Sequence, residues 1–80
     1  MVDTADFLAM AARIVAAAGH RVADADPEDL ARLLELRDLV DEAVIEAVRG
    51  LRDAGITWED IGAAVGTTRQ AAIMRWNPKL

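Results

Sequence analysis

Two short helical segments joined by a glycine turn lie in residues 55–76, and no other stretch constrains the fold of this chain as much. Thr57 is placed to cap the first segment, because its side-chain oxygen can accept a hydrogen bond from the amide of Asp60. Gly66 can take the positive φ that ends a helix. The pattern therefore predicts a short helix that begins after Thr57 and stops before Gly66.

The second segment begins with two threonines, and either Thr67 or Thr68 can cap it. Gln70 lies three residues after Thr67 and would complete a capping box with it. The segment should end before Asn77, because the proline that follows disfavours helical backbone at that residue. Trp58 and Trp76 are expected in the core that joins the segments to the rest of the chain. Further core or small positions are expected at Ile61, Gly62, Val65, Gly66 and Ala72.

Two helices with a short turn that contains glycine match the helix-turn-helix motif. The string W-x-x-I-G-x-x-V-G-x-x-R-Q-A-A-x-x-R-W, residues 58–76, resembles the C-terminal half of a family of small actinobacterial and actinophage helix-turn-helix proteins. It is also similar to the region of sigma factors that reads promoter elements. One departure is Thr67, where that family usually has valine. The resemblance covers about the last third of the chain and implies DNA binding.

The resemblance also implies roles for individual residues. The second helix of such a motif enters the major groove, where Arg69 can pair with guanine and Gln70 with adenine. Ile73, one turn on, could meet a thymine methyl group, and several arginines could contact phosphates. The complete set of expected DNA contacts is Thr57, Thr67, Thr68, Arg69, Gln70, Ile73, Arg75, Arg49 and Arg52. A plain structural hairpin of two helices is the alternative interpretation of the same stretch.

The preceding residues, 1–54, predict two longer helices. The first should span about Thr4–Ala18, capped by Asp3 and stopped by Gly19, with a loop over residues 19–26. The second should begin at Pro27 and run to Ala54, with Gly55 as its left-handed stop. We therefore expect one all-α domain of four helices. Residues 1–54 form its helical and dimerisation part, and residues 55–77 form its helix-turn-helix.

The long predicted helix carries two apolar stripes, so it needs two packing partners. One stripe can pack against the other helices of the same chain. The other stripe could pack against the same helix of a second copy, which would make a homodimer. A short chain rich in alanine has little core volume, which favours such a dimer. The alternative is that both stripes belong to an intramolecular core. The residues assigned to the dimer interface are Leu36, Leu39, Ala43 and Gly50.

Charge is distributed unevenly along the chain, whose net charge is −5. Residues 1–48 carry eleven acidic residues and four arginines, or −7, whereas residues 49–80 carry five basic and three acidic residues, or +2. The expected DNA-reading end is thus the basic end. The acidic face of the long helix supports a second hypothesis: a protein-interaction module that docks on a transcription-machinery or repressor partner.

Several function classes find no support in the residues. The chain has no cysteine and one histidine, His20, so we expect no metal site, no cofactor and no enzymatic activity. Its apolar runs are shorter than a membrane span, and its first charged residues are Asp3 and Asp6 rather than basic ones, unlike a secretory signal. We expect a cytoplasmic, nucleoid-associated protein.

Overall fold

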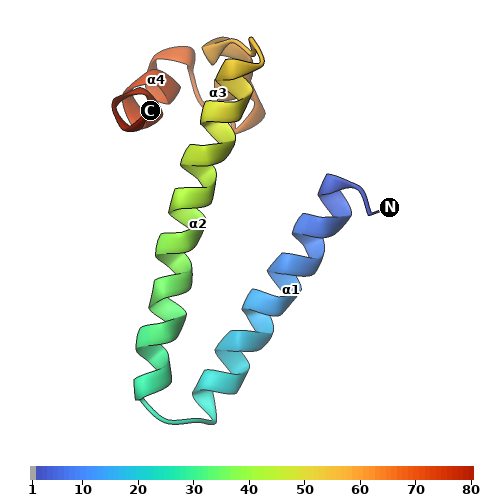
Figure 1. The fold of residues 1–80 in the computed structure, drawn as a ribbon, viewed down its shortest axis with the longest axis vertical. Helices are drawn as coiled ribbons and strands as arrows, with labels where there is room; N and C mark the ends of the chain where they lie inside the picture. The colour runs from blue at the N-terminus through green and yellow to red at the C-terminus, as the bar shows by residue number, and fades with distance from the viewer. Residues whose placement is uncertain (1) are drawn as a thin grey trace. The chain divides into compact units, whose positions relative to one another are not determined.

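The structure is a computed structural model in which residues 2–80 are described. These residues form four α-helices and one short 3-10 helix, with no strand among them, which confirms the predicted all-α class (Figure 1). None of the helices formed by residues 2–80 is both long and apolar enough to cross a membrane. The elements are α1 (Thr4–Ala23), α2 (Glu28–Asp53), α3 (Trp58–Ala64), α4 (Arg69–Trp76) and η1 (Asn77–Lys79).

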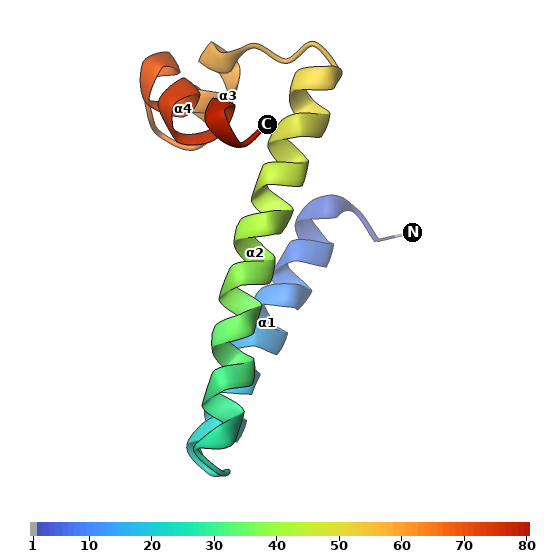
Figure 2. The ribbon, with the colours of Figure 1, turned by 60° about the vertical axis from the view of Figure 1, so that its left-hand side comes forward.

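The chain divides into two compact units, Met1–Asp38 and Leu39–Leu80, called unit 1 and unit 2 below. The boundary falls inside α2, which is one unbroken helix in both views (Figures 1 and 2). Unit 1 contains α1 and the start of α2. Unit 2 contains the rest of α2 together with α3, α4 and η1.

Helix α1 begins where the sequence predicts and ends later. Asp3 caps it, because the Asp6 amide donates to the Asp3 Oδ1 at 2.8 Å. The predicted end at Ala18 is wrong, since the helix continues through Gly19 to Ala23, and of the loop predicted over residues 19–26 only residues 24–26 lie outside a helix. A glycine inside a helix costs only about 1 kcal/mol. The four residues that follow Gly19 can all be helical, so the backbone hydrogen bonds continue until Asp24.

Helix α2 ends in the motif that the sequence predicts. Gly55 has a φ of 89°, its amide donates to the Arg52 carbonyl at 2.9 Å, and the Ile56 amide donates to the Leu51 carbonyl at 3.0 Å. These two bonds define a Schellman end. The helix passes through Gly50 without a break, and a Cβ added there would meet nothing within 4 Å. No other segment in the described part of the chain therefore approaches Gly50 closely.

A small apolar core lies in unit 2. Its buried residues come from three helices and bring both tryptophans together, which confirms the core positions predicted for Trp58, Ile61, Ala72 and Trp76. Val65 is 56% exposed, so its predicted core position is wrong. The reason is that α3 ends at Ala64 and Val65 is its C-cap, where the four-residue spacing of a helix no longer applies. The core consists of Val48, Trp58, Ile61, Ala72 and Trp76, with Ile45 and Ile73 half-buried against it.

Unit 1 differs in having no buried residue among those described. Helix α1 in particular exposes its large apolar side chains, although its sparse charge suggests burial on more than one side. The exposed fraction is 57% for Phe7, 61% for Leu8 and 64% for Ile14. Within unit 1 this apolar pattern is thus left without a partner that covers it.

The C-terminal residues continue beyond α4 as a short helix. Residues Asn77–Lys79 form the helix η1, and the Leu80 amide donates to the Asn77 carbonyl at 3.2 Å. The Arg49 Nη2 donates to the Lys79 carbonyl at 3.5 Å, which ties η1 to α2 within unit 2. Pro78 starts the tight helix, because its φ is already fixed near the helical value.

Candidate functional site

Helices α3 and α4 are both started by threonine caps. The Thr57 Oγ1 accepts from the Asp60 amide at 3.1 Å, as predicted, and the Thr68 Oγ1 accepts from the Ala71 amide at 3.1 Å. Thr68 is therefore the cap of α4, and the alternative box between Thr67 and Gln70 does not form. The consequence is that α4 begins at Arg69, with Gln70 also in its first turn.

The connection between α3 and α4 is held by close backbone packing. Gly66 has a φ of 75°, and the Thr67 amide donates to the Gly62 carbonyl at 2.8 Å. A Cβ added to Gly62 would lie 2.8 Å from the Thr68 carbonyl oxygen and 3.0 Å from that of Thr67. Any residue other than glycine at position 62 would force the turn or α3 to move. The packing of the turn on α3 therefore fixes the direction in which α4 leaves the turn.

One side of α4 is anchored and the opposite side is open. Ala72 and Trp76 are buried four residues apart, whereas Gln70 and Met74, also four apart, are exposed. Met74 is 69% exposed, more than any other large apolar residue in residues 2–80. Ile73, which the sequence assigned to a base contact, is half-buried against the core. The sequence analysis predicted no contact for Met74, although the helical phase set by the buried Ala72 and Trp76 places the Met74 side chain on the outer side of α4.

Three arginines that were expected at phosphates each make a contact within the chain. The Arg52 Nη1 donates to the Ile56 carbonyl at 2.9 Å, and its guanidinium lies 4.9 Å from the centre of the Trp58 ring. The Arg75 guanidinium lies 5.0 Å from the centre of the Trp76 ring, and Arg49 holds η1 as described above. Each of these three guanidinium groups thus packs on a tryptophan ring or donates a hydrogen bond within unit 2. Removing one would weaken packing as well as remove a positive charge.

The charges around α4 are not uniformly positive. A groove of about 480 Å³ in unit 2 is lined by Asp41 and Glu42 of α2 and by Arg75 and Lys79 from the C-terminal end. The two carboxylates lower the positive potential near these two cations. Arg69 begins α4 at the other end of the helix and is exposed. Of the basic residues in unit 2, Arg69 is therefore the best placed to meet an anionic partner.

The remaining predicted residues are accessible. Thr67 is half-buried in the turn, and Thr57 is exposed at the start of α3. The residues assigned to a dimer interface all lie on exposed parts of α2, where Leu36 is 38% and Leu39 is 57% exposed. Leu36 belongs to unit 1, while Leu39, Ala43 and Gly50 belong to unit 2. No cluster of side chains that could hold a metal ion occurs in residues 2–80.

Comparison of the chain with known protein families, with curated proteins and with solved structures finds no match.

Proposed function

We propose that this protein binds double-stranded DNA in a sequence-specific manner and regulates transcription, with α3, the turn and α4 acting as a helix-turn-helix. One observation supports the proposal above all: the first turn of α4 is exposed, while the other side of the same helix is packed in the core. Ala72 and Trp76 hold one side in the core, while Arg69 and Gln70 remain exposed. A recognition helix needs this combination, because its N-terminal side chains must reach base edges without loosening the fold.

The dimensions of the segment support the same proposal. Helix α3 has seven residues and α4 has eight, and the intervening turn contains a glycine with positive φ. The close packing at Gly62 fixes the crossing of the two helices, as a reader of the major groove requires. The similarity of residues 58–76 to actinobacterial and actinophage helix-turn-helix proteins points the same way.

Three exposed residues of α4 have a definite role in this proposal. Arg69 donates to the O6 and N7 atoms of guanine, and Gln70 pairs with the N6 and N7 atoms of adenine. Met74 replaces Ile73 as the apolar contact with a thymine methyl group, because Met74 is exposed and Ile73 packs on the core. The hydroxyl of Thr68 accepts from the Ala71 amide, and its O–H can donate to a nearby phosphate.

A mobility-shift titration tests the proposal, with DNA that has been selected for binding and a scrambled duplex of the same composition. Arg69→Ala should weaken binding to selected DNA by about 1–3 kcal/mol and change binding to scrambled DNA much less. Arg13→Ala, checked by sedimentation to have the same mass as the wild type, is the matched control, since it removes the same charge from α1. For a dimer that contacts four to eight phosphates, the slope of log K against log salt should be about −4 to −7.

A second function, docking on a protein of the transcription machinery through the acidic face of α2, predicts a different result. The side chains of that face, including Glu35, Asp38 and Glu46, are exposed. In that case the wild-type protein would bind neither DNA at low salt, and Arg69→Ala would behave like the wild type.

A further inference from the structure

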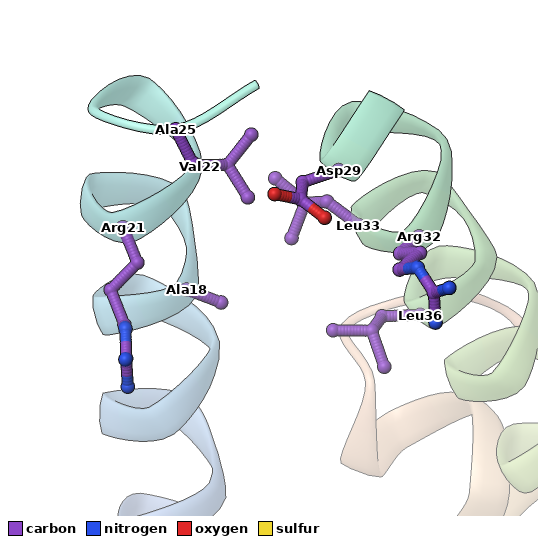
Figure 3. A pocket seen from close by; sticks show the side chains of 8 residues that line it. All are labelled: Ala18, Arg21, Val22, Ala25, Asp29, Arg32, Leu33 and Leu36. Carbon is purple, nitrogen blue, oxygen red and sulfur yellow. The ribbon is translucent and has the colours of Figure 1, made fainter. Parts of the chain in front are cut away.

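A groove of about 550 Å³ lies in unit 1, between the C-terminal part of α1 and the N-terminal part of α2. Figure 3 shows Ala18 and Val22 of α1 facing Leu33 and Leu36 of α2 across an open space. The two helices thus turn apolar sides toward each other without closing on one another. No residue among those described in unit 1 is buried, so this part of the chain lacks a core of its own.

The exposed apolar area of unit 1 is as large as a stable interface. Nine large apolar side chains are between 38% and 64% exposed. With roughly 150–200 Å² for each fully exposed residue, they amount to roughly 700–900 Å² per chain. Each partner in a standard stable interface buries about 800 Å². The nine are Val2, Phe7, Leu8, Met10, Ile14, Val15, Leu30, Leu34 and Leu36.

The pattern along α1 is that of a helix in a bundle. Apolar residues recur at alternating spacings of four and three in Phe7, Ala11, Ile14 and Ala18, so the two small alanines are seven residues apart. The apolar side of α2 in unit 1 runs from Leu36 through Leu33 and Leu30 to Leu34 and covers about half of the helix circumference, with Arg37 as the one charged residue near its middle. A helix in a two-helix hairpin has one neighbour, whereas a helix in a four-helix bundle has two. The width of the α2 surface therefore requires a second neighbour.

Charge indicates which helix that neighbour is. Within unit 1, α1 carries Arg13 and Arg21 against Asp6, a net charge of +1. Residues 28–38 of α2 carry four acidic residues and two arginines, a net charge of −2, and further acidic residues follow in the same helix. Two copies of α2 side by side would repel each other, whereas α1 beside α2 of another copy brings opposite charges together.

We propose that two copies of this chain pair through their α1–α2 hairpins into an antiparallel four-helix bundle. The grooves of the two copies face each other, and α1 of each copy packs between its own α2 and the α2 of the second copy. This arrangement differs from the sequence-based expectation that α2 meets α2, because like helices lie on the diagonals of the bundle. It does not depend on DNA binding.

Sedimentation equilibrium tests the pairing. The wild-type chain, of 8.6 kDa, should sediment with twice that mass at micromolar concentration. Ile14→Glu should raise the dimer dissociation constant at least about 100-fold, because it places a charge in the bundle core. Ala16→Glu is the matched control, since residue 16 is also exposed but lies on the opposite side of α1, and it should sediment like the wild type.

Tryptophan emission separates loss of pairing from general unfolding, because Trp58 and Trp76 both lie in unit 2. Unchanged emission in a monomeric Ile14→Glu variant supports the proposal, whether or not unit 1 keeps its helicity. A wild-type chain that stays monomeric at high micromolar concentration overturns the proposal. Equal behaviour of Ile14→Glu and Ala16→Glu overturns it as well.

Cross-linking identifies the helices that meet, and it is possible because the chain has no cysteine of its own. Ala18→Cys and Leu33→Cys are prepared as separate chains of different length, mixed, and treated with a short bis-maleimide. The bundle predicts mixed cross-linked dimers in preference to dimers of either variant with itself. Preferential linking of Leu33→Cys to itself would instead show that α2 meets α2, and would overturn the proposal.

Discussion

Two glycines inside helices of the same unit should respond in opposite ways to the same substitution. In Gly62→Ala, the added methyl group would lie 2.8 Å from the Thr68 carbonyl oxygen and 3.0 Å from the Thr67 carbonyl oxygen. Both are backbone atoms of the turn, so the turn or α3 must move. Overpacking of this kind costs about 1–3 kcal/mol, and the better helix propensity of alanine offsets up to about 1 kcal/mol. We expect a net loss of about 1–2 kcal/mol.

Gly50→Ala is the matched control, because it lies inside α2 and its added methyl group would meet nothing within 4 Å. Only the helix propensity changes, so the free energy of unfolding should rise by about 0.5–1 kcal/mol. For a chain of this size, 1 kcal/mol shifts Tm by roughly 4–8 °C. The two variants should therefore melt on opposite sides of the wild type.

Thermal unfolding followed by far-UV circular dichroism and tryptophan emission measures both variants. An increase in Tm for Gly62→Ala equal to that for Gly50→Ala would refute the close packing of the turn on α3. A decrease in Tm for Gly50→Ala would show that another backbone approaches α2 at this residue, as in a dimer where α2 meets α2.

Other substitutions test the core and the turn. Trp58→Ala should lower the free energy of unfolding by about 3–5 kcal/mol in urea titrations, since Trp58 is buried in a core of five residues, and an unchanged urea midpoint would contradict this core. Gly66→Val should cost about 1–3 kcal/mol more than Gly66→Asn, because asparagine tolerates a φ of 75° and valine does not. Equal melting temperatures of the two Gly66 variants would mean that the turn does not need positive φ.

The local parts of the fold could be predicted from the sequence because neighbours in the sequence determine them. The cap at Thr57 and the left-handed stops at Gly55 and Gly66 each depend on backbone hydrogen bonds that span three to five residues. Gly19 shows the limit of this reasoning. A glycine permits a helix to stop but does not require it. Helix α1 continues past Gly19 because the residues that follow are compatible with helical backbone.

The candidate site could be predicted only in part, because side-chain contacts are not visible in a list of residues. The basic character of residues 49–80 follows from the sequence, but the contact of Arg52 with Trp58 does not. The exposure of Met74 and the partial burial of Ile73 follow from the phase of α4. That phase could have been derived from Ala72 and Trp76, whose spacing marks the buried side.

Selection of bound duplexes from a random DNA pool shows whether α4 reads a base sequence. The wild type should enrich a short motif, and Arg13→Ala should enrich the same motif. Arg69→Ala should lose preference at one base pair of each half-site, where a good bidentate contact with guanine is worth about 1–3 kcal/mol. Enrichment of no motif by the wild type, or of an identical motif by Arg69→Ala, would contradict the assignment of α4 as the helix that reads DNA.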